Sequence, residues 1–277
     1  MSGDRSLPVD VAAIQTVPEF GAVSKNVERT VDAIEACGDA ELIVLPELAN
    51  TGYAFDSRSE ARELAEPSDG PTVAAWEAAA SRVDAWIVGG YAERAGAALY
   101  NSAAVVSPDG LVGTYRKTHL WDEEHLRFEP GEALPVFSTP FGRLGVQICN
   151  DLWFPEATLT QAKRGADLVA LPTNWVPATA DGARPGGWTI GVHAAVANAN
   201  ANRVAFACAD RAGTERGLEF MGQSAILDPD GLVAAGAAPA DGEATLSATV
   251  DLAAARRKPI TDYDHVLADR RPELYDT

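Results

Sequence analysis

Apolar and polar positions alternate along the chain in blocks that predict an α/β protein. Short, nearly continuous apolar runs such as ELIVLPE (41–47) and DLVALPTNW (167–175) are typical of strands buried on both faces. Longer stretches with helical spacing lie between such runs, and Pro71 suits the first turn of one of them. The pattern predicts helices over 24–38, 71–83, 156–166 and about 187–203, and strands over 9–17, 41–47, 85–93, 167–175, 203–210 and 244–252.

Three further stretches are predicted to form β-hairpins. Asp109-Gly110 marks the bend of a hairpin over 102–117, and a second hairpin over 137–151 turns at Gly142. The third covers 224–236 and also bends at an Asp-Gly pair. Purely parallel sheets rarely contain hairpins, so these stretches count against the rival fold, a doubly wound parallel sheet.

Two segments of the first half recur in the second half. CGDAELIVLPE (37–47) resembles RGADLVALPTN (164–174), and SPDGLVG (107–113) resembles DPDGLVA (228–234). Repetition at this spacing predicts two similar α/β halves. Two such halves can pack sheet on sheet with helices outside, as a four-layer α-β-β-α sandwich of two mixed sheets.

The division of the chain follows from the same pattern. No Ser/Gly linker and no break in composition interrupts it, so we expect one domain over 1–277. Residues 256–277 are polar and are predicted to form an irregular C-terminal tail.

Composition narrows the class of partners. The net charge of -18 would repel phosphates, which argues against nucleic acid. No window approaches 18 consecutive apolar residues, and the first residues lack a basic start followed by an apolar stretch, so neither a membrane span nor a secretory signal is expected. Three widely spaced cysteines fit free thiols in a reducing cytoplasm.

The kind of charge is also informative. Only four of the 22 basic residues are lysines, and 40 residues are acidic. An acid-rich, lysine-poor surface suits a salt-rich cytosol, where counterions screen the repulsion between like charges. The composition therefore suggests a halophilic source.

Cys149 is the first candidate for chemistry. It lies in LGVQICNDLWFPE (144–156), where an apolar strand ends and a helix is about to begin. Most buried cysteines are inert, but a thiol at such a turn lies beside backbone N–H groups that no helix uses yet, including that of Asn150. A thiol nucleophile also needs a base. None of the four histidines lies in a recognisable Cys–His context.

Two other residues could complete such a site. Glu47 ends a buried apolar run, where desolvation would raise its pKa toward the range of a general base. If the strand instead ends at the surface, Glu47 is only a solvated cap. Lys117 is one of few lysines, and its compact ammonium could stabilise an oxyanion, although most lysines lie at the surface.

These three signals occur in blocks that resemble the nitrilase superfamily of carbon–nitrogen hydrolases. The blocks are LIVLPELANTGY (42–53), GTYRKTHLWDEEHLRFEPGE (113–132) and LGVQICNDLWFPE (144–156), and a later segment, GTERGLEFMGQSAILDPDG (213–231), also matches. The resemblance runs from about residue 9 to the tail. It implies the α-β-β-α sandwich, no metal or organic cofactor, and assembly as a homodimer or larger oligomer.

The resemblance also implies roles for individual residues. Glu47 would be the general base, Lys117 the cation that stabilises the transition state, and Cys149 the nucleophile. Many members carry a second glutamate six residues before a Pro-Gly pair, and Glu124 fits this spacing, with Glu123 as the adjacent competitor.

Residues beside these blocks are candidates for substrate binding, with core packing as the alternative for the two tryptophans. Asn174 and Trp175 follow the strand that repeats Glu47's strand, so they should emerge at the same rim. The candidates are Tyr53, Asn150, Trp153, Asn174 and Trp175.

One segment departs from the family pattern, and another raises the alternative of a metal site. Many members carry an R-A-x-E-N segment, whereas this chain has Asn198-Ala199-Asn200-Ala201-Asn202, which puts local packing in doubt. HLWDEEH (119–125) holds two histidines and three acids, but the histidines are six residues apart and do not share a helix face as HExxH ligands would. We therefore expect no metal site.

The sequence thus predicts a cysteine-dependent hydrolase of a small amide or carbamoyl compound. A nitrilase that converts a small aliphatic nitrile to an acid and ammonia is the alternative, because the same residues serve both reactions. A catalytically silent scaffold or binding subunit is the alternative from another class.

Overall fold

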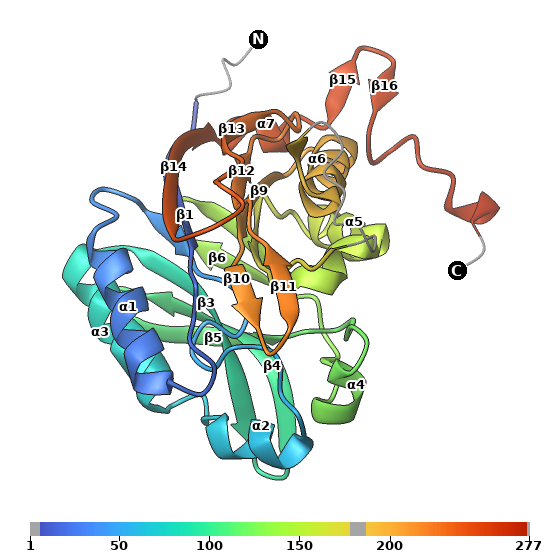
Figure 1. The fold of residues 1–277 in the computed structure, drawn as a ribbon. Coiled ribbons are helices and arrows are strands. Elements are labelled where there is room, and N and C mark those ends of the chain that lie inside the picture. The colour runs from blue at the N-terminus through green and yellow to red at the C-terminus, as the bar shows by residue number, and fades with distance from the viewer. Residues whose placement is uncertain (1–5, 178–186, 276–277) are drawn as a thin grey trace.

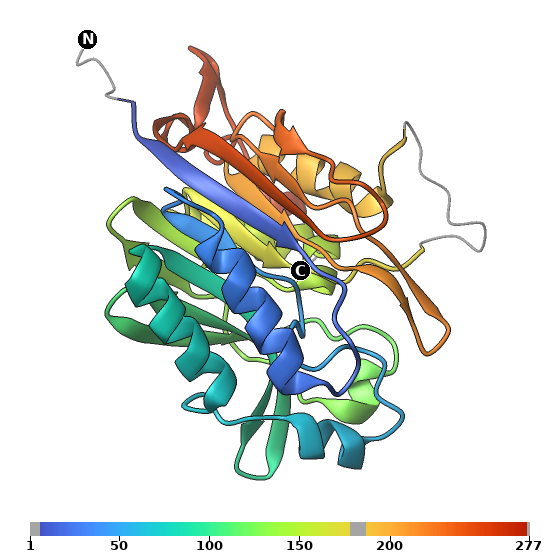
Figure 2. The same cartoon turned by 60° about the vertical axis from the view of Figure 1, so that its left-hand side comes forward.

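Two six-stranded mixed sheets pack face to face, with helices on their outer faces (Figure 1, Figure 2). The computed structural model describes residues 6–177 and 187–275. The first sheet has the order β14 (Ala244–Asp251), β1 (Pro8–Gln15), β2 (Leu42–Val44), β3 (Trp86–Ala95), β4 (Ala98–Ser107) and β5 (Gly110–Arg116). The second has the order β13 (Val233–Gly236), β12 (Ala225–Leu227), β9 (Ala205–Ala209), β8 (Leu168–Pro172), β7 (Gly142–Val146) and β6 (Val136–Thr139). The predicted fold is confirmed.

The two sheets have the same internal pattern. In the first sheet β1, β2 and β3 are parallel neighbours, and β4 and β5 follow as antiparallel strands. In the second sheet β7, β8 and β9 are parallel neighbours, and β12 and β13 follow as antiparallel strands. The segments that repeat in the sequence therefore enter equivalent strands, β2 and β8.

Three apolar layers hold the sandwich together. Side chains of both sheets, such as Val44 and Val146, meet in the central layer. Helices α1 (Val23–Glu35) and α3 (Pro71–Val83) cover the first sheet, and the fully buried Trp76 of α3 packs in the layer between them and the sheet. Helices α5 (Pro155–Lys163) and α6 (Ile190–Asn202) cover the second sheet (Figure 2). Each large apolar side chain buried in this way contributes roughly 1.5–3 kcal/mol.

Some predicted boundaries differ from the structure. The helix over 71–83 agrees, but the strands predicted over 41–47 and 167–175 end at Val44 and Pro172. Their last residues leave the ladder at the edge where the parallel strands end. β4 begins at Ala98 rather than at 102, so β3 and β4 form a long hairpin that the pattern did not predict.

The pattern also missed several short elements. Helix α2 (Arg58–Leu64) is largely charged, yet Ser57 caps it by accepting from the Glu60 N–H, so its Ser-x-x-Glu spacing was a usable signal. The hairpin of β10 (Ala212–Glu215) and β11 (Leu218–Met221) was also missed. The remaining short elements are α4 (Glu124–Arg127), η1 (Cys149–Trp153), α7 (Ala253–Arg256), β15 (Pro259–Thr261), β16 (Asp264–His265) and η3 (Pro272–Leu274).

The tail has more structure than predicted. β15 and β16 form a small hairpin that projects from the main body (Figure 1), and Leu267 after it packs against the apolar layer of α6. Lys258 donates hydrogen bonds to the carbonyls of Asn202 and Arg203, and Arg270 donates to that of Ala201. These cations satisfy carbonyl groups at the C-terminal end of α6, where the helix dipole favours positive charge. Within residues 6–177 and 187–275, no helix is long and apolar enough to cross a membrane.

Candidate active site

Cys149 lies at a sharp turn between β7 and α5. Its φ of 43° is in the left-handed region, which non-glycine residues rarely adopt. It opens the short helix η1, and α5 begins at Pro155. Strained backbone of this kind persists only where the surroundings hold it in place, and such positions cluster at functional sites.

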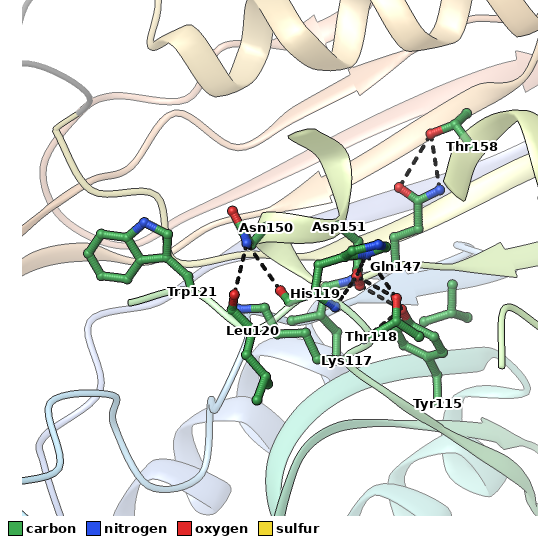
Figure 3. Close-up of polar contacts among 12 residues, drawn as sticks. Tyr115, Lys117, Thr118, His119, Leu120, Trp121, Gln147, Asn150, Asp151 and Thr158 are labelled. Atoms are coloured by element: carbon green, nitrogen blue, oxygen red, sulfur yellow. Dashed lines mark hydrogen bonds and ion pairs between the residues drawn. The ribbon is translucent and has the colours of Figure 1, made fainter. Parts of the chain in front are cut away.

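Asp151 fixes this turn to the loop that follows β5 (Figure 3). Its Oδ2 accepts hydrogen bonds from the Ile148 N–H at 2.8 Å and from the Tyr115 hydroxyl at 2.6 Å. Its Oδ1 accepts from the Thr118 hydroxyl at 2.8 Å and from the His119 N–H at 2.9 Å. One buried carboxylate thus sets the position of Cys149's turn relative to Lys117's loop.

Asn150 adds a second link between the same two loops. Its Nδ2 donates to the carbonyls of His119 and Leu120, at 3.2 Å each (Figure 3). With its side chain held this way, Asn150 lines the cavity beside Cys149.

Glu47, Lys117 and Glu124 form a buried cluster of charges. The Lys117 ammonium donates to Glu47 Oε1 at 2.7 Å and to Glu124 Oε1 at 2.8 Å. The ammonium and both carboxylates are almost fully removed from solvent. Charges buried in this way are costly unless they are paired, so the three groups hold one another in place.

Two neutral side chains complete the cluster. Asn101 Nδ2 donates to Glu47 Oε1 at 2.6 Å and to Glu124 Oε1 at 3.2 Å. The Tyr53 hydroxyl donates to Glu124 Oε1 at 2.8 Å. Glu47 Oε2, in contrast, is buried and has no hydrogen-bond partner among the described residues. One oxygen of Glu47 is therefore fixed by donors, and the other is available.

Glycine at one position of β3 explains how Glu47 reaches this place. A Cβ on Gly90 would lie 2.4 Å from the Pro46 carbonyl oxygen and 2.5 Å from the Glu47 Cα. The Gly90 N–H donates to that Pro46 carbonyl at 3.0 Å. The chain leaving β2 can follow β3 this closely only because Gly90 has no side chain.

Glu47 and Lys117 have perturbed acidities. Burial raises the pKa of Glu47 to about 7, against the lowering effect of Lys117, and the negative Glu124 adds to the rise. Burial lowers the pKa of Lys117, but the carboxylates of Glu124 and Glu47 outweigh it and hold that pKa well above its usual range. Lys117 is therefore a permanent cation, and Glu47 can change its protonation state near neutral pH.

Cys149 shares this electrostatic environment. Burial raises the pKa of the Cys149 thiol well above its ordinary value, and the charge of Glu47 raises it further. Lys117, the Thr173 hydroxyl and the Asn174 N–H act in the opposite direction. The resting group is therefore a neutral thiol, and a base is needed to make it a nucleophile.

A cavity of about 240 Å³ opens above Cys149. The structure places all five of the candidate binding residues in its lining: Tyr53, Asn150, Trp153, Asn174 and Trp175. Asn174 Nδ2 donates to the Glu47 carbonyl at 2.9 Å, so the residues after β2 and β8 do meet at one rim. Trp175 is largely buried and serves both the core and the cavity wall, whereas Trp153 is 43% exposed.

The structure separates the two adjacent glutamates. Glu124 contacts Lys117, whereas the exposed Glu123 pairs with Arg127. Histidine does not join Cys149 in the cavity lining, and His119 stacks on Phe154. In the described part of the chain, no group of three or more His, Cys, Asp or Glu side chains is arranged to hold a metal ion.

The unusual asparagine segment of α6 packs against the site. Asn198 is buried, and its Nδ2 donates to the Leu152 carbonyl at 3.2 Å and to the Ala194 carbonyl at 3.0 Å. Asn202 in turn donates to the Asn198 carbonyl. The segment therefore supports η1, which follows Cys149, without the arginine and glutamate that many family members have.

Sequence reasoning missed a brace from the β10–β11 hairpin. Glu215 Oε1 accepts from the N–H groups of Tyr53 and Ala54, at 2.7 Å each. Its other oxygen pairs with the buried Arg211 at 2.9 Å, and that guanidinium stacks on the ring of Phe220. Asn101 was missed as well, although an asparagine inside an apolar strand is a signal that could have been used.

Comparison with known proteins shows which family the chain matches. Residues 10–259 match the family described as carbon-nitrogen hydrolase. A nitrilase of Pyrococcus abyssi is 39% identical over 271 residues, which cover 96% of this chain and 99% of that protein. An N-carbamoylputrescine amidase of Arabidopsis thaliana is 34% identical, with 91% and 89% covered. The solved structure of a carbon-nitrogen hydrolase of Helicobacter pylori superimposes with a TM-score of 0.83 at 25% identity, covering 97% of both chains.

The fold, the family match and the relatives agree. The chain belongs to the carbon–nitrogen hydrolase family, and it is an enzyme of the amidase and nitrilase kind.

Proposed function

We propose that this enzyme hydrolyses a non-peptide C–N bond of a small amide or carbamoyl compound through a thioester on Cys149. The products are a carboxylic acid and ammonia or an amine. One observation carries the proposal: Lys117 and Asn101 fix one oxygen of Glu47, and its second oxygen is buried, without a hydrogen-bond partner among the described residues, in the same charged environment as Cys149. The amidase among the relatives supports the same class of substrate.

In the first half of the reaction, Glu47 takes the proton of the Cys149 thiol as sulfur attacks the amide carbon. The negative charge that develops on oxygen faces Lys117 and the Asn150 N–H. Loss of one such preorganised donor typically costs about 3–4 kcal/mol in the transition state. Glu47 then gives its proton to the leaving nitrogen, and the C–N bond breaks to leave a thioester.

In the second half, Glu47 deprotonates a water molecule that attacks the thioester. The carbon–sulfur bond breaks, the acid is released, and the proton returns to sulfur. Splitting one hydrolysis into two acyl transfers is the advantage of a covalent nucleophile. Glu124 accepts a second hydrogen bond from Lys117 and, through the Tyr53 hydroxyl, holds a residue of the cavity wall.

A nitrile is the second candidate substrate. The 39% identity to the Pyrococcus abyssi nitrilase favours it, and the same residues would serve. In that reaction sulfur attacks the nitrile carbon, and the negative charge develops on nitrogen. Since the same residues serve both reactions, the choice between an amide and a nitrile depends on the shape and polarity of the cavity.

The test is a substrate panel read out as ammonia release. We expect turnover of one or more amides, carbamoyl acids or aliphatic nitriles, and Cys149→Ala should abolish it while the protein stays folded. Cys37→Ala is the matched control, because Cys37 lies at the end of α1 and also has a free thiol. Turnover by Cys149→Ala would defeat the mechanism. Failure on every substrate, with Cys149 inert to iodoacetamide, would favour a silent scaffold.

We also propose that the enzyme is a cytoplasmic homodimer or larger oligomer. Its three cysteines are free, as expected in a reducing compartment. The tail exposes Tyr263, Leu274 and Tyr275, and exposed apolar side chains of this kind are suited to a neighbouring subunit. Light scattering on the full chain and on a chain ending at Lys258 tests this. An unchanged mass after truncation would show that the tail does not hold the oligomer together.

A further inference from the structure

Among the described residues, no ionised side chain lines the cavity. The described residues that line the cavity are aromatic, aliphatic, small or amide side chains together with Cys149, and none of them is ionised. Tyr53, Trp121, Trp153 and Trp175 provide its aromatic surface. Glu47 and Lys117 are buried and paired with each other, and their charges act on Cys149.

We infer that the cavity binds an uncharged, largely apolar acyl group, and that Gly191 sets the room for it by accommodating Trp175. The inference rests on the proposed amide hydrolysis and narrows its substrate class. An ionised group on the substrate would lose its hydration on entering the cavity and would find no opposite charge among the described lining residues. Carbamoyl amino acids, which carry a carboxylate, are therefore poorer substrates than neutral amides.

Packing against Trp175, rather than backbone conformation, explains why position 191 is a glycine. It lies in the first turn of α6, where an alanine would suit the helix better. A Cβ placed on Gly191 would lie 2.3 Å from Cε2 and 2.8 Å from Nε1 of Trp175. The indole thus rests directly against this glycine, and any side chain here would force the ring to move. Because Trp175 lines the cavity, such a move changes the room for the acyl group.

The first experiment compares three amides of similar size with the wild-type enzyme. Pentanamide is neutral, 4-aminobutanamide carries an ammonium, and succinamate carries a carboxylate. We expect kcat/KM for pentanamide, from ammonia release, to exceed both others by at least about 100-fold. Equal or faster turnover of succinamate overturns the inference. So does equal or faster turnover of 4-aminobutanamide, whose ammonium the aromatic rings could attract.

A binding measurement separates this inference from the proposed hydrolysis. The same three amides are titrated into Cys149→Ala by calorimetry. If pentanamide binds most tightly but the wild-type enzyme hydrolyses no amide, the inference stands and the proposed function fails. If amides are hydrolysed with no preference for the neutral one, the proposed function stands and the inference fails.

The second experiment tests Gly191. We expect Gly191→Ala to lower kcat/KM for pentanamide about 10-fold or more, while acetamide changes by less than about twofold. Trp175→Phe has a smaller ring, so in the double variant Gly191→Ala should cost pentanamide much less than it does alone. Equal losses on both amides, or no such rescue, would contradict the role of Gly191. Melting temperatures of all three variants identify any loss that comes from unfolding.

Discussion

The two sheets of this enzyme share one topology but contribute different chemistry. The related segments 37–47 and 164–174 lead into β2 and β8, and the related turns 107–113 and 228–234 join β4 to β5 and β12 to β13. Yet Glu47 follows the Leu-Pro pair of the first copy, whereas Thr173 follows the Leu-Pro pair of the second, with Asn174 as the next residue. The repeated segments give the two sheets the same topology, whereas the candidate active site depends on residues that differ between the two copies.

The difference locates the proposed general base in the first copy of the repeat. Asn174 donates to the Glu47 carbonyl, so the ends of the two copies meet, but only the first copy ends in an acid. Lys117 follows the last strand of the first sheet, and Cys149 follows the first parallel strand of the second. Each half therefore lacks part of the site, and only their packing assembles it.

The largest effect should come from replacing Glu47, the acid that has no counterpart in the second copy of the repeat. Glu47→Gln keeps the shape of the side chain but cannot take a proton, so we expect kcat to fall at least about 1000-fold. Ammonia release measures the loss, and thermal melting confirms the fold. Glu219→Gln, an exposed residue of β11, is the matched control and should keep full activity. Substantial activity of Glu47→Gln would show that the acid present only in the first copy of the repeat is not needed for the reaction.

A smaller effect should come from Glu215 of the β10–β11 hairpin, which holds the backbone of Tyr53 and Ala54 in the first half. Glu215→Gln leaves Arg211 buried without its partner, so we expect a loss of roughly 3 kcal/mol in the free energy of unfolding. Because Tyr53 loses a fixed backbone position, kcat/KM should fall about 10-fold. In Tyr53→Phe, which lacks the hydroxyl bonded to Glu124, the same change should cost less activity. Strictly additive losses would show that Glu215 acts independently of Tyr53.

The pH profile sharpens the comparison further. Glu47 must be ionised to act as a base, and burial raises its pKa to about 7, so kcat/KM should rise with pH through about 7. The charge of Glu124 contributes to that raised pKa. Glu124→Gln removes this charge, so the rise should move to lower pH even though activity is reduced. A profile that stays in place would mean that another group controls the reaction.

The smallest effect concerns the surface that both halves share. With 40 acidic and 22 basic residues, repulsion between like charges opposes folding until counterions screen it. We expect the melting temperature to rise by at least about 2–4 °C in molar KCl, which corresponds to roughly 1 kcal/mol. A melting temperature that stays constant or falls as KCl is added would count against the hypothesis of a halophilic source.

The sequence determined the layers, the repeat and the candidate residues of the site. Local signals sufficed for these, because strand and helix periods, Asp-Gly turns and short motifs are properties of neighbouring residues. The tertiary structure decided how close those residues come and what surrounds them. Glu47 and Lys117 are 70 positions apart, and Glu215 and Tyr53 are 162 apart, so no local pattern can show that they touch. The free oxygen of Glu47, the brace at Glu215 and the fit of Trp175 on Gly191 exist only after the two sheets pack, because each depends on atoms that packing alone brings together.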